Sequence, residues 1–178
     1  MTRYIADLHL GHKAIHKFAG EHRGGVSSLE EHDQWIIDRW NSVVRKNDVT
    51  WVLGDAAFSN KGLEKIKKLN GVKHLLLGNH DDFSIDKYKK YFNKVTGFHK
   101  KASIWFSHPP IHEESLRNLV NVHGHTHHRK VYHPGYFCVS VEPLGGIPIS
   151  LDEIIDRAGW KEWYDGIRKD KRAQNEKM

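Results

Sequence analysis

Residues 72–81 read Val-Lys-His-Leu-Leu-Leu-Gly-Asn-His-Asp, a largely apolar run that ends in a glycine followed by three polar side chains. A short run of this kind, bounded by Asn70-Gly71 and by Gly78, predicts a buried β-strand over 72–77. Ligands of open α/β sheets bind at the carboxyl ends of the strands. Asn79 and His80 are therefore candidate site residues.

The same arrangement, an apolar run followed by a polar cluster, occurs four more times along the chain. The clusters are Asp7-Leu8-His9 after 2–6, Gly54-Asp55 after 48–53, Ser107-His108 after 102–107, and Gly124-His125-Thr126-His127 after 119–122. Five strand ends can bring these distant residues into one pocket. Mixed carboxylate, amide and imidazole ligands favour Mn, Fe, Zn, Ni or Co over Ca or Mg. The set fits two divalent metal ions that hold a nucleophilic water.

The segments between these clusters predict helices. Ser28 and Glu31 form a capping-box pattern before apolar residues at helical spacing, which predicts a helix over 28–46. Further helices are expected over 61–69, over 84–92 and from 151, and further strands over 94–98, 136–141 and 147–150. Strands and helices alternate first and a strand-rich half follows, so the fold class is α/β with layered sheets and helices outside.

Composition predicts a single domain. The chain has 178 residues, and we expect one domain over 1–165 with a polar, disordered tail over 166–178. No apolar run approaches the roughly 18 residues needed to cross a bilayer, so no membrane partner is expected. Cys138 is the only cysteine, and Asp7 comes too early for a secretory signal; both favour a reducing, cytoplasmic location. The net charge of +6 favours anionic partners only weakly.

Taken together and in order, the five clusters resemble the calcineurin-like metallophosphoesterase superfamily, whose pattern is DxH, GD, GNH[DE], H and GHxH. The motifs span residues 4–127, and the stretch from Val139-Ser140-Val141-Glu142 to Leu151 is similar to the end of small bacterial and phage members. The resemblance implies a four-layer α/β/β/α sandwich of two mixed β-sheets flanked by helices. It also implies hydrolysis of a phosphoester by a hydroxide held between two divalent ions.

The resemblance assigns roles to individual residues. It places Asp7, His9, Asp55 and His127 around one metal ion, and Asp55, Asn79, His108 and His125 around the other. Asn79 and His80 would lie beside the scissile phosphate, where His80 stabilises the transition state or protonates the leaving oxygen. Asp81 would either orient His80 or be an ordinary loop carboxylate. His12 and His123 are candidates to support the ligands from behind, and Arg23 is either a phosphate contact or solvated.

Differences between this sequence and individual branches of the family narrow the range of possible substrates. After Gly54-Asp55 the chain lacks the second Asp and the Arg of protein phosphatases, and position 58 is Phe where purple acid phosphatases need Tyr. Only 27 residues separate His80 from His108, too few for the capping domain of repair nucleases. A compact, open site remains, typical of phosphodiesterases that act on a nucleotide-type or other small phosphate substrate.

Four alternatives stay open at this point. The enzyme could be a phosphomonoesterase acting on nucleotides, or a nuclease that processes nucleic-acid ends. A binding module without activity is disfavoured because His80 and every ligand are retained. The fourth is a nucleic-acid-binding protein with a structural metal site, although zinc in such sites is satisfied by four ligands.

Overall fold

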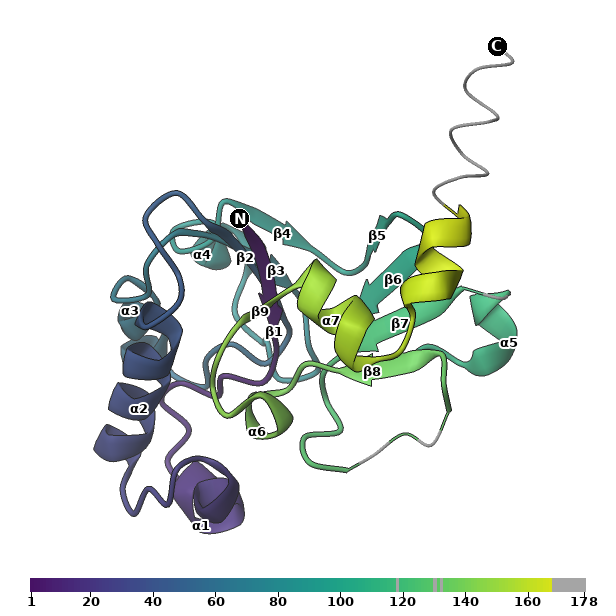
Figure 1. Cartoon of the computed structure of the whole chain (residues 1–178). Helices are drawn as coiled ribbons and strands as arrows, with labels where there is room; N and C mark the ends of the chain where they lie inside the picture. Colours follow the sequence, from purple (N-terminus) through teal and green to yellow (C-terminus); the bar gives the residue numbers. More distant parts are fainter. Residues whose placement is uncertain (118, 130, 132, 168–178) are drawn as a thin grey trace.

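In the computed structural model, which describes residues 1–117, 119–129, 131 and 133–167, two mixed β-sheets form the centre of the molecule (Figure 1). The first sheet has the order β4-β3-β2-β1-β9. Its strands are β1 (Thr2–Ile5), β2 (Val49–Leu53), β3 (Val72–Leu76), β4 (Lys94–Thr96) and β9 (Ile149–Ser150). Strands β1 to β4 pair in parallel, whereas β9 runs antiparallel to β1.

The second sheet has the order β5-β6-β7-β8. Its strands are β5 (His99–Lys101), β6 (Ile104–Ser107), β7 (Val120–His123) and β8 (Tyr136–Cys138). Strand β5 is antiparallel to β6, and the other pairs are parallel. The sheets meet face to face where the ring of Tyr4 stacks on Phe106, with centroids 4.6 Å apart and both side chains buried. The hydrophobic core therefore lies between and around the two sheets.

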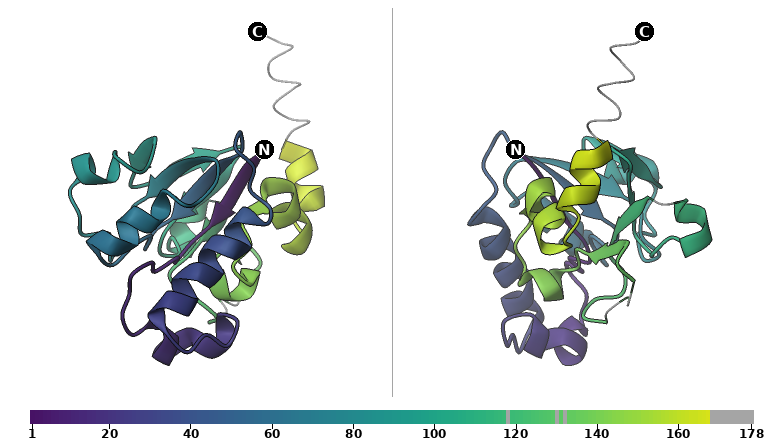
Figure 2. Two further views of the ribbon diagram at one scale, coloured as in Figure 1. Left: turned by 90° about the vertical axis from the view of Figure 1, so that its left-hand side faces the viewer. Right: turned by 45° about the vertical axis from the view of Figure 1, so that its right-hand side comes forward.

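Helices cover the outside of the sheets (Figure 2). They are α1 (Ile15–Ala19), the 3-10 helix η1 (Gly20–His22), α2 (Leu29–Asn41), α3 (Asn60–Ile66), α4 (Ile85–Tyr88), α5 (Glu113–Leu116), α6 (Val141–Leu144) and α7 (Leu151–Arg157). Helix α7 contacts β1 and β9, and Trp160 beyond it packs against Phe137 of β8. The structure confirms the predicted α/β sandwich of two mixed sheets flanked by helices.

Individual elements differ from the sequence predictions at their ends. Helix α2 begins at Leu29 with the Ser28 hydroxyl accepting from the Glu31 amide, but it ends at Asn41 rather than 46. The capping box is also incomplete, because the Glu31 carboxylate accepts from Ser27 instead of the Ser28 amide. The segment expected as a helix over 84–92 is helical only over Ile85–Tyr88. A separate strand, β5, and helix α6 were not predicted.

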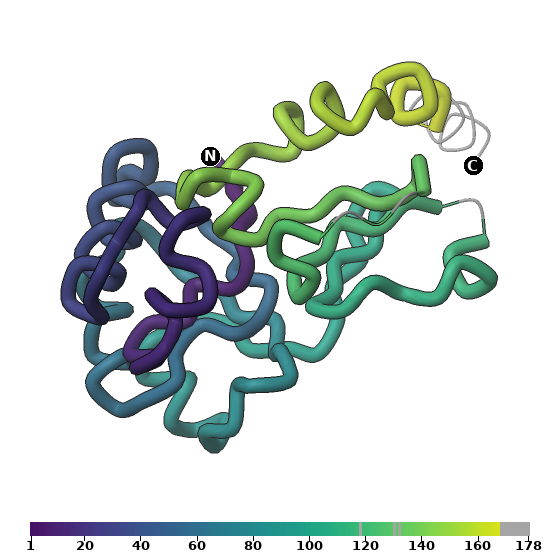
Figure 3. Tube along the Cα trace, turned by 90° about the horizontal axis from the view of Figure 1, so that it is seen from below, coloured from purple at the N-terminus to yellow at the C-terminus, as the bar shows by residue number. Residues whose placement is uncertain are grey.

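The chain end is partly described. Residues 161–167 are helical, so residues 166 and 167 do not belong to the predicted disordered tail, and the rest of that tail lies outside the described residues. Among the described residues, no helix combines the length and apolar character that crossing a bilayer requires. Viewed from below, the first part of the chain (purple to blue) and the last described part (green to yellow) lie side by side (Figure 3).

Candidate metal centre

The polar clusters meet because the strands before them run in parallel. The Asp7 amide donates to the Gly54 carbonyl at 3.0 Å, and the His9 amide donates to the Asp55 carbonyl at 2.9 Å, which continues the β1–β2 ladder past the strand ends. A bridge between Ala6 and Ser140 then ties the end of β1 to the segment after β8. Residues from both sheets thus converge on one point.

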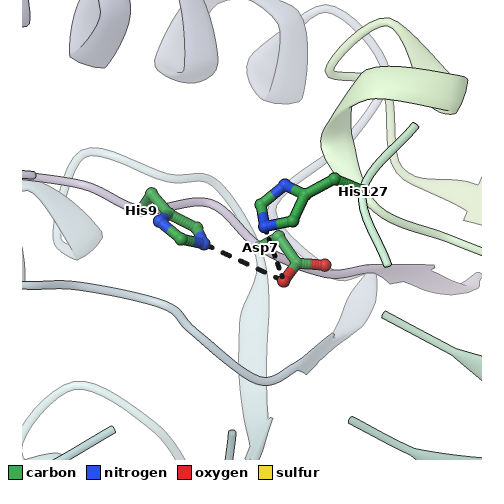
Figure 4. Close-up of side chains that lie close together, drawn as sticks. All are labelled: Asp7, His9 and His127. Atoms are coloured by element: carbon green, nitrogen blue, oxygen red, sulfur yellow. Dashed lines mark ion pairs between the residues drawn. The ribbon is translucent and has the colours of Figure 1, made fainter. Parts of the chain in front are cut away.

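The carboxylate of Asp7 is fully buried at this point. Its Oδ2 accepts from the Ser140 hydroxyl at 2.7 Å and from the His125 amide at 2.9 Å. Its Oδ1 lies 3.9 Å from Nε2 of His9 and 3.9 Å from Nε2 of His127 (Figure 4). The protein therefore holds Oδ2 through two donors. Oδ1, which accepts only the longer bond from the His125 amide at 3.2 Å, also faces the two imidazole nitrogens.

Asp55 occupies the position between two histidines. Its Oδ2 lies 3.7 Å from Nε2 of His9 and 3.4 Å from Nε2 of His108, while its Oδ1 accepts from the His80 amide at 3.0 Å. The ligand atoms of Asp7, His9 and His127 all lie within 4.8 Å of one another, and so do those of Asp7, Asp55 and His108. Two adjoining groups of ligand atoms are thus present: Asp7 belongs to both, and Asp55 of the second group lies beside His9 of the first.

His108 presents a lone pair to a neighbouring oxygen. Its Nδ1 donates to the Leu53 carbonyl at 2.8 Å, and its Nε2 lies 2.9 Å from Oδ1 of Asn79. When Nδ1 carries the proton of the neutral ring, Nε2 and Oδ1 are both acceptors. Two lone pairs at that distance require a proton or a cation between them. The side chain of Asn79 thus lies directly beside the ring of His108, and its role as a metal ligand remains a prediction.

The last two histidines come from the segment after β7. Nδ1 of His127 donates to Oε1 of Glu142 at 2.8 Å, which leaves Nε2 facing Asp7. The ring of His125 meets that of His108 edge to face, with centroids 5.0 Å apart. All seven residues that the sequence proposed as ligands therefore lie together: Asp7, His9, Asp55, Asn79, His108, His125 and His127.

The environment of His9 shows whether this cluster suits a cation. Its side chain is buried, yet neither Nδ1 nor Nε2 has a hydrogen-bond partner among the described residues. Burial lowers the pKa of His9 to about 4, so the ring is neutral at pH 7 and offers a lone pair. Although burial alone would raise the pKa of Asp7, its contact with His9 and the charges of His108 and His127 hold that pKa below the usual range. The neutral ring of His9 beside ionised carboxylates offers the lone pairs that divalent metal ions bind.

Backbone strain is concentrated at the same residues. Asp7, His9, Asp55, His125 and His127 have φ values between 54° and 66°, the left-handed region, which is costly for residues other than glycine. Only three further non-glycine residues of the described chain share it: Ala102, Ser103 and Arg117. Strain of this kind persists where surrounding structure enforces it, commonly at functional sites.

Two motif glycines are required by close approach. Gly54 has a φ of +87°, and a Cβ built there would lie 2.2 Å from Nδ1 of His108. A Cβ on Gly124 would lie 2.7 Å from Oδ2 of Asp7. A side chain at either position would displace a candidate ligand, so these glycines belong to the centre through its packing.

The structure corrects two sequence interpretations. Arg23 is completely buried: it pairs with Glu142 and donates to the carbonyls of Asp7 and Leu8, so it neither contacts substrate nor is solvated. Asp81 accepts from the backbone amides of Asp55, Ala56 and Gly78, and no hydrogen bond to the His80 side chain is present among the described residues. Its role is to hold the turn after β2 against the turn after β3.

The remaining predicted residues surround the ligands. His80 is exposed, and its ring lies beside Phe58, with centroids 4.9 Å apart. The ring of His12 stacks on the same Phe58 ring and lies beside the ring of His9. His123 is buried, and its Nδ1 contacts the Gly124 carbonyl at 2.8 Å. Within the described chain, neither ring hydrogen-bonds a candidate ligand, although the His12 backbone amide donates to the His9 carbonyl at 3.1 Å.

Sequence reasoning missed the groups that do hold the ligands. They are Glu142 on His127, Ser140 on Asp7, and the Leu53 carbonyl on His108. Such outer partners fix the orientation of a ligand and raise its basicity. Ser140 and Glu142 lie in the stretch that resembles the end of small family members, which was the one available signal.

Nearly the whole chain, and not only its five motifs, matches a known protein family. The family model described as calcineurin-like phosphoesterase matches residues 4–177. The chain belongs to this family. Its cluster of imidazoles, carboxylates and one amide, with buried nitrogens on His9 that lack a partner among the described residues, fits the divalent metal ions implied by metallophosphoesterases.

Several known proteins are similar to this member of the family. An uncharacterized protein of Methanocaldococcus jannaschii is 30% identical over 163 residues, covering 85% of this chain and 87% of that protein. The gene 66 protein of Mycobacterium phage L5 is 42% identical over 85 residues, or 45% of this chain and 39% of the phage protein. The match thus spans about two fifths of the phage relative's length. A crystal structure of a protein of unknown function from Aquifex aeolicus superimposes with a TM-score of 0.69 at 28% identity, covering 88% of this chain and 98% of that one.

Proposed function

We propose that this family member is a phosphodiesterase that uses two divalent metal ions, Mn, Fe, Zn, Ni or Co, to hydrolyse a nucleotide-type or other small phosphodiester. The observation that carries the proposal is the position of Asp55 Oδ2, 3.7 Å from His9 Nε2 and 3.4 Å from His108 Nε2. A carboxylate between two imidazoles of separate ligand groups is suited to bridging two ions. When bound, the ions would activate water as the nucleophile and neutralise charge on the phosphoryl oxygens.

The protein's own residues would orient the ester and supply the proton that the leaving group takes up. His9, Asp7 and His127 hold one side of the centre, and His108, Asn79 and His125 hold the other. The exposed ring of His80 can donate a proton from a ring N–H to the leaving-group oxygen, which is general acid catalysis. The Asp55 carboxylate fixes the backbone of His80, since it accepts from the His80 amide at 3.0 Å.

A diester is favoured over a monoester because of the charge around the centre. A monoester dianion carries an extra negative charge that enzymes commonly bind with a bidentate Arg. Arg23 is buried and already paired with Glu142, and the exposed Arg129 lines the adjoining cleft. Phosphomonoesterase and nucleic-acid-end nuclease activities are therefore the alternative outcomes of the test. The cytoplasmic location stays a prediction.

The decisive experiment is hydrolysis of bis-p-nitrophenyl phosphate by protein loaded in turn with Mn, Zn, Ni, Co or Fe. We expect turnover that a chelator abolishes and that exceeds turnover of p-nitrophenyl phosphate and of a labelled oligonucleotide. Asp55→Asn should lower the rate by more than about 100-fold, because even outer partners of metal ligands are worth about 10–100-fold. Asp82→Asn, an exposed carboxylate nearby, is the matched control. Hydrolysis rates that neither the chelator nor the Asp55→Asn substitution lowers would refute the proposal.

A further inference from the structure

A cleft of about 500 Å3 opens directly beside the metal centre. Three of its lining residues, His9, His125 and His127, are candidate metal ligands. The remainder comes from His12, from α1 and from the segment after β7, and the last two lie at the same end of the molecule (Figure 1). Its volume falls within the roughly 300–1,000 Å3 of small-molecule sites. The cleft therefore adjoins the place where we expect the phosphate of a substrate to bind.

One wall of the cleft is apolar and ends in an exposed aromatic ring. Ile15, Phe18 and Ala19 of α1 form this wall. Ile15 and Ala19 are buried, whereas Phe18 is 75% exposed, the highest value among the large hydrophobic residues of the described chain. An exposed Phe forgoes the gain of burial, so its place beside a site points to a ligand that covers it.

The lining residues from the segment after β7 form a second wall, which is polar and carries one cationic side chain. Thr126, His128 and Arg129 line it. The ring of His128 stacks on that of His22 with centroids 4.6 Å apart, which joins this wall to the segment after α1. Arg129 is exposed and forms no ion pair or side-chain hydrogen bond among the described residues. Its planar guanidinium is thus free to donate to acceptors on a ligand.

We propose that this cleft is a nucleobase subsite, in which the base of a nucleotide-type phosphoester stacks on Phe18 while Arg129 donates to acceptors on the base edge. The inference rests on the proposed function, because the phosphate must occupy the adjoining metal centre. The lining supports a base over other groups. An aromatic ring gives a stacking face that accepts any base, and a guanidinium matches carbonyl and ring-nitrogen acceptors. A purely alkyl group would leave Arg129 and His128 without a partner.

The test measures binding, independently of turnover. Manganese-loaded protein is titrated calorimetrically with adenosine 5′-monophosphate, ribose 5-phosphate and hexyl phosphate. The first two share the sugar and phosphate and differ only in the base. We expect adenosine 5′-monophosphate to bind about tenfold more tightly than ribose 5-phosphate, which is the order of one base–aromatic stack. Hexyl phosphate should bind no better than ribose 5-phosphate.

Substitutions of single lining residues show which side chains cause the preference for the base. Phe18→Ala should remove most of the tenfold preference without changing the affinity for ribose 5-phosphate, and Phe18→Trp should keep it. Arg129→Ala should weaken adenosine 5′-monophosphate severalfold. Phe98→Ala is the matched control, because Phe98 is 62% exposed and lines a different groove. It should change none of these affinities.

Each contrary result has a separate meaning. Equal binding of adenosine 5′-monophosphate and ribose 5-phosphate, or an unchanged preference in Phe18→Ala, would overturn the subsite and leave the phosphoesterase proposal standing. Tighter binding of hexyl phosphate would also overturn it, in favour of an apolar occupant. Failure of all three phosphates to bind would refute both the subsite and the phosphate site at the metals.

Discussion

At the scale of single residues, the histidines of the centre differ in what holds their second ring nitrogen. A carboxylate, Glu142, holds His127, and a backbone carbonyl, that of Leu53, holds His108. Glu142 in turn pairs with the buried guanidinium of Arg23, which also donates to the carbonyl of Asp7. His127 is therefore positioned by a chain of buried charges that ends on another ligand's backbone.

Glu142→Gln should weaken metal binding. The amide keeps an acceptor for His127 but removes the negative charge that polarises the ring and pairs with Arg23. We expect the affinity for Mn²⁺ to fall by about 10–100-fold, the usual effect of losing an outer partner. Calorimetric titration measures it, and Glu113→Gln serves as the control because that side chain is 66% exposed. An unchanged affinity would show that Glu142 does not position His127.

His80→Ala should separate catalysis from metal binding. The ring of His80 is exposed and is not among the ligand groups, so its removal should leave metal content unchanged. Loss of a general acid should lower turnover by about 10²–10⁴-fold. Elemental analysis and steady-state rates on the diester check both points. The exposed His112→Ala variant is the control, and a wild-type rate in His80→Ala would exclude the assigned role.

At the scale of elements, one buried carboxylate ties three segments together behind the centre. Asp33 of α2 accepts from the Gly11 amide at 3.1 Å, from Nζ of Lys65 on α3 at 2.6 Å, and contacts Nδ1 of His32 at 2.9 Å. The loop that leaves β1 with Asp7 and His9 is thereby anchored to two helices. These contacts favour the charged form of Asp33.

The stability of the fold should depend on pH through Asp33. Burial alone would raise its pKa, but the bonds from His32, Lys65 and Gly11 hold the pKa below its usual value. A lowered folded-state pKa means that the contribution is complete above the unfolded value, about 4, and is lost as pH falls through the folded value. Asp33→Asn should lower the free energy of unfolding by about 1–3 kcal/mol at pH 7. Urea denaturation measures this.

The difference between wild type and Asp33→Asn should shrink below about pH 4, because protonation then removes the same charge. Asp38→Asn, on the exposed side of the same helix, should show neither the loss at pH 7 nor the convergence at low pH. A constant difference between pH 7 and 3.5 would mean that Asp33 acts through packing rather than through its charge.

At the scale of the whole molecule, each sheet supplies about half of the centre. Asp7, Asp55 and Asn79 follow strands of the first sheet. His108, His125 and His127 follow strands of the second. Bound cations would therefore hold the two sheets together at this end, in addition to the Tyr4–Phe106 contact between them.

Metal removal should lower the melting temperature. A ligand at about 1,000 times its Kd stabilises the folded state by about 4 kcal/mol, which for a chain of this size corresponds to about 8–16 °C. Calorimetric scans with excess Mn²⁺ and with chelator measure the shift. The Asp55→Asn variant, deprived of the shared carboxylate, should shift much less. Identical melting temperatures with metal and with chelator would argue against a cation that bridges the sheets.

The strands and the ligand types were predictable because both are local properties. An apolar run between turn residues marks β3 and β2, and the polar cluster after each run can be seen without knowing its neighbours. Strand β5 was missed because His99–Lys101 has no apolar run, and pairing with β6 makes it a strand. The residues 42–46 were predicted as helix from spacing, yet α2 ends at Asn41 and these residues belong to the connection to β2, which begins at Val49.

The sequence by itself therefore determined the fold class and which side chains could bind metal, since those follow from the chemistry of short segments. Only the tertiary structure decided what the supporting residues do. Arg23 became a buried partner of Glu142, 119 positions away, and Asp81 became a clamp on the backbone of the turn after β2. Local sequence cannot specify such partners. A charged side chain pairs with whichever opposite charge the packed sheets bring within hydrogen-bond distance.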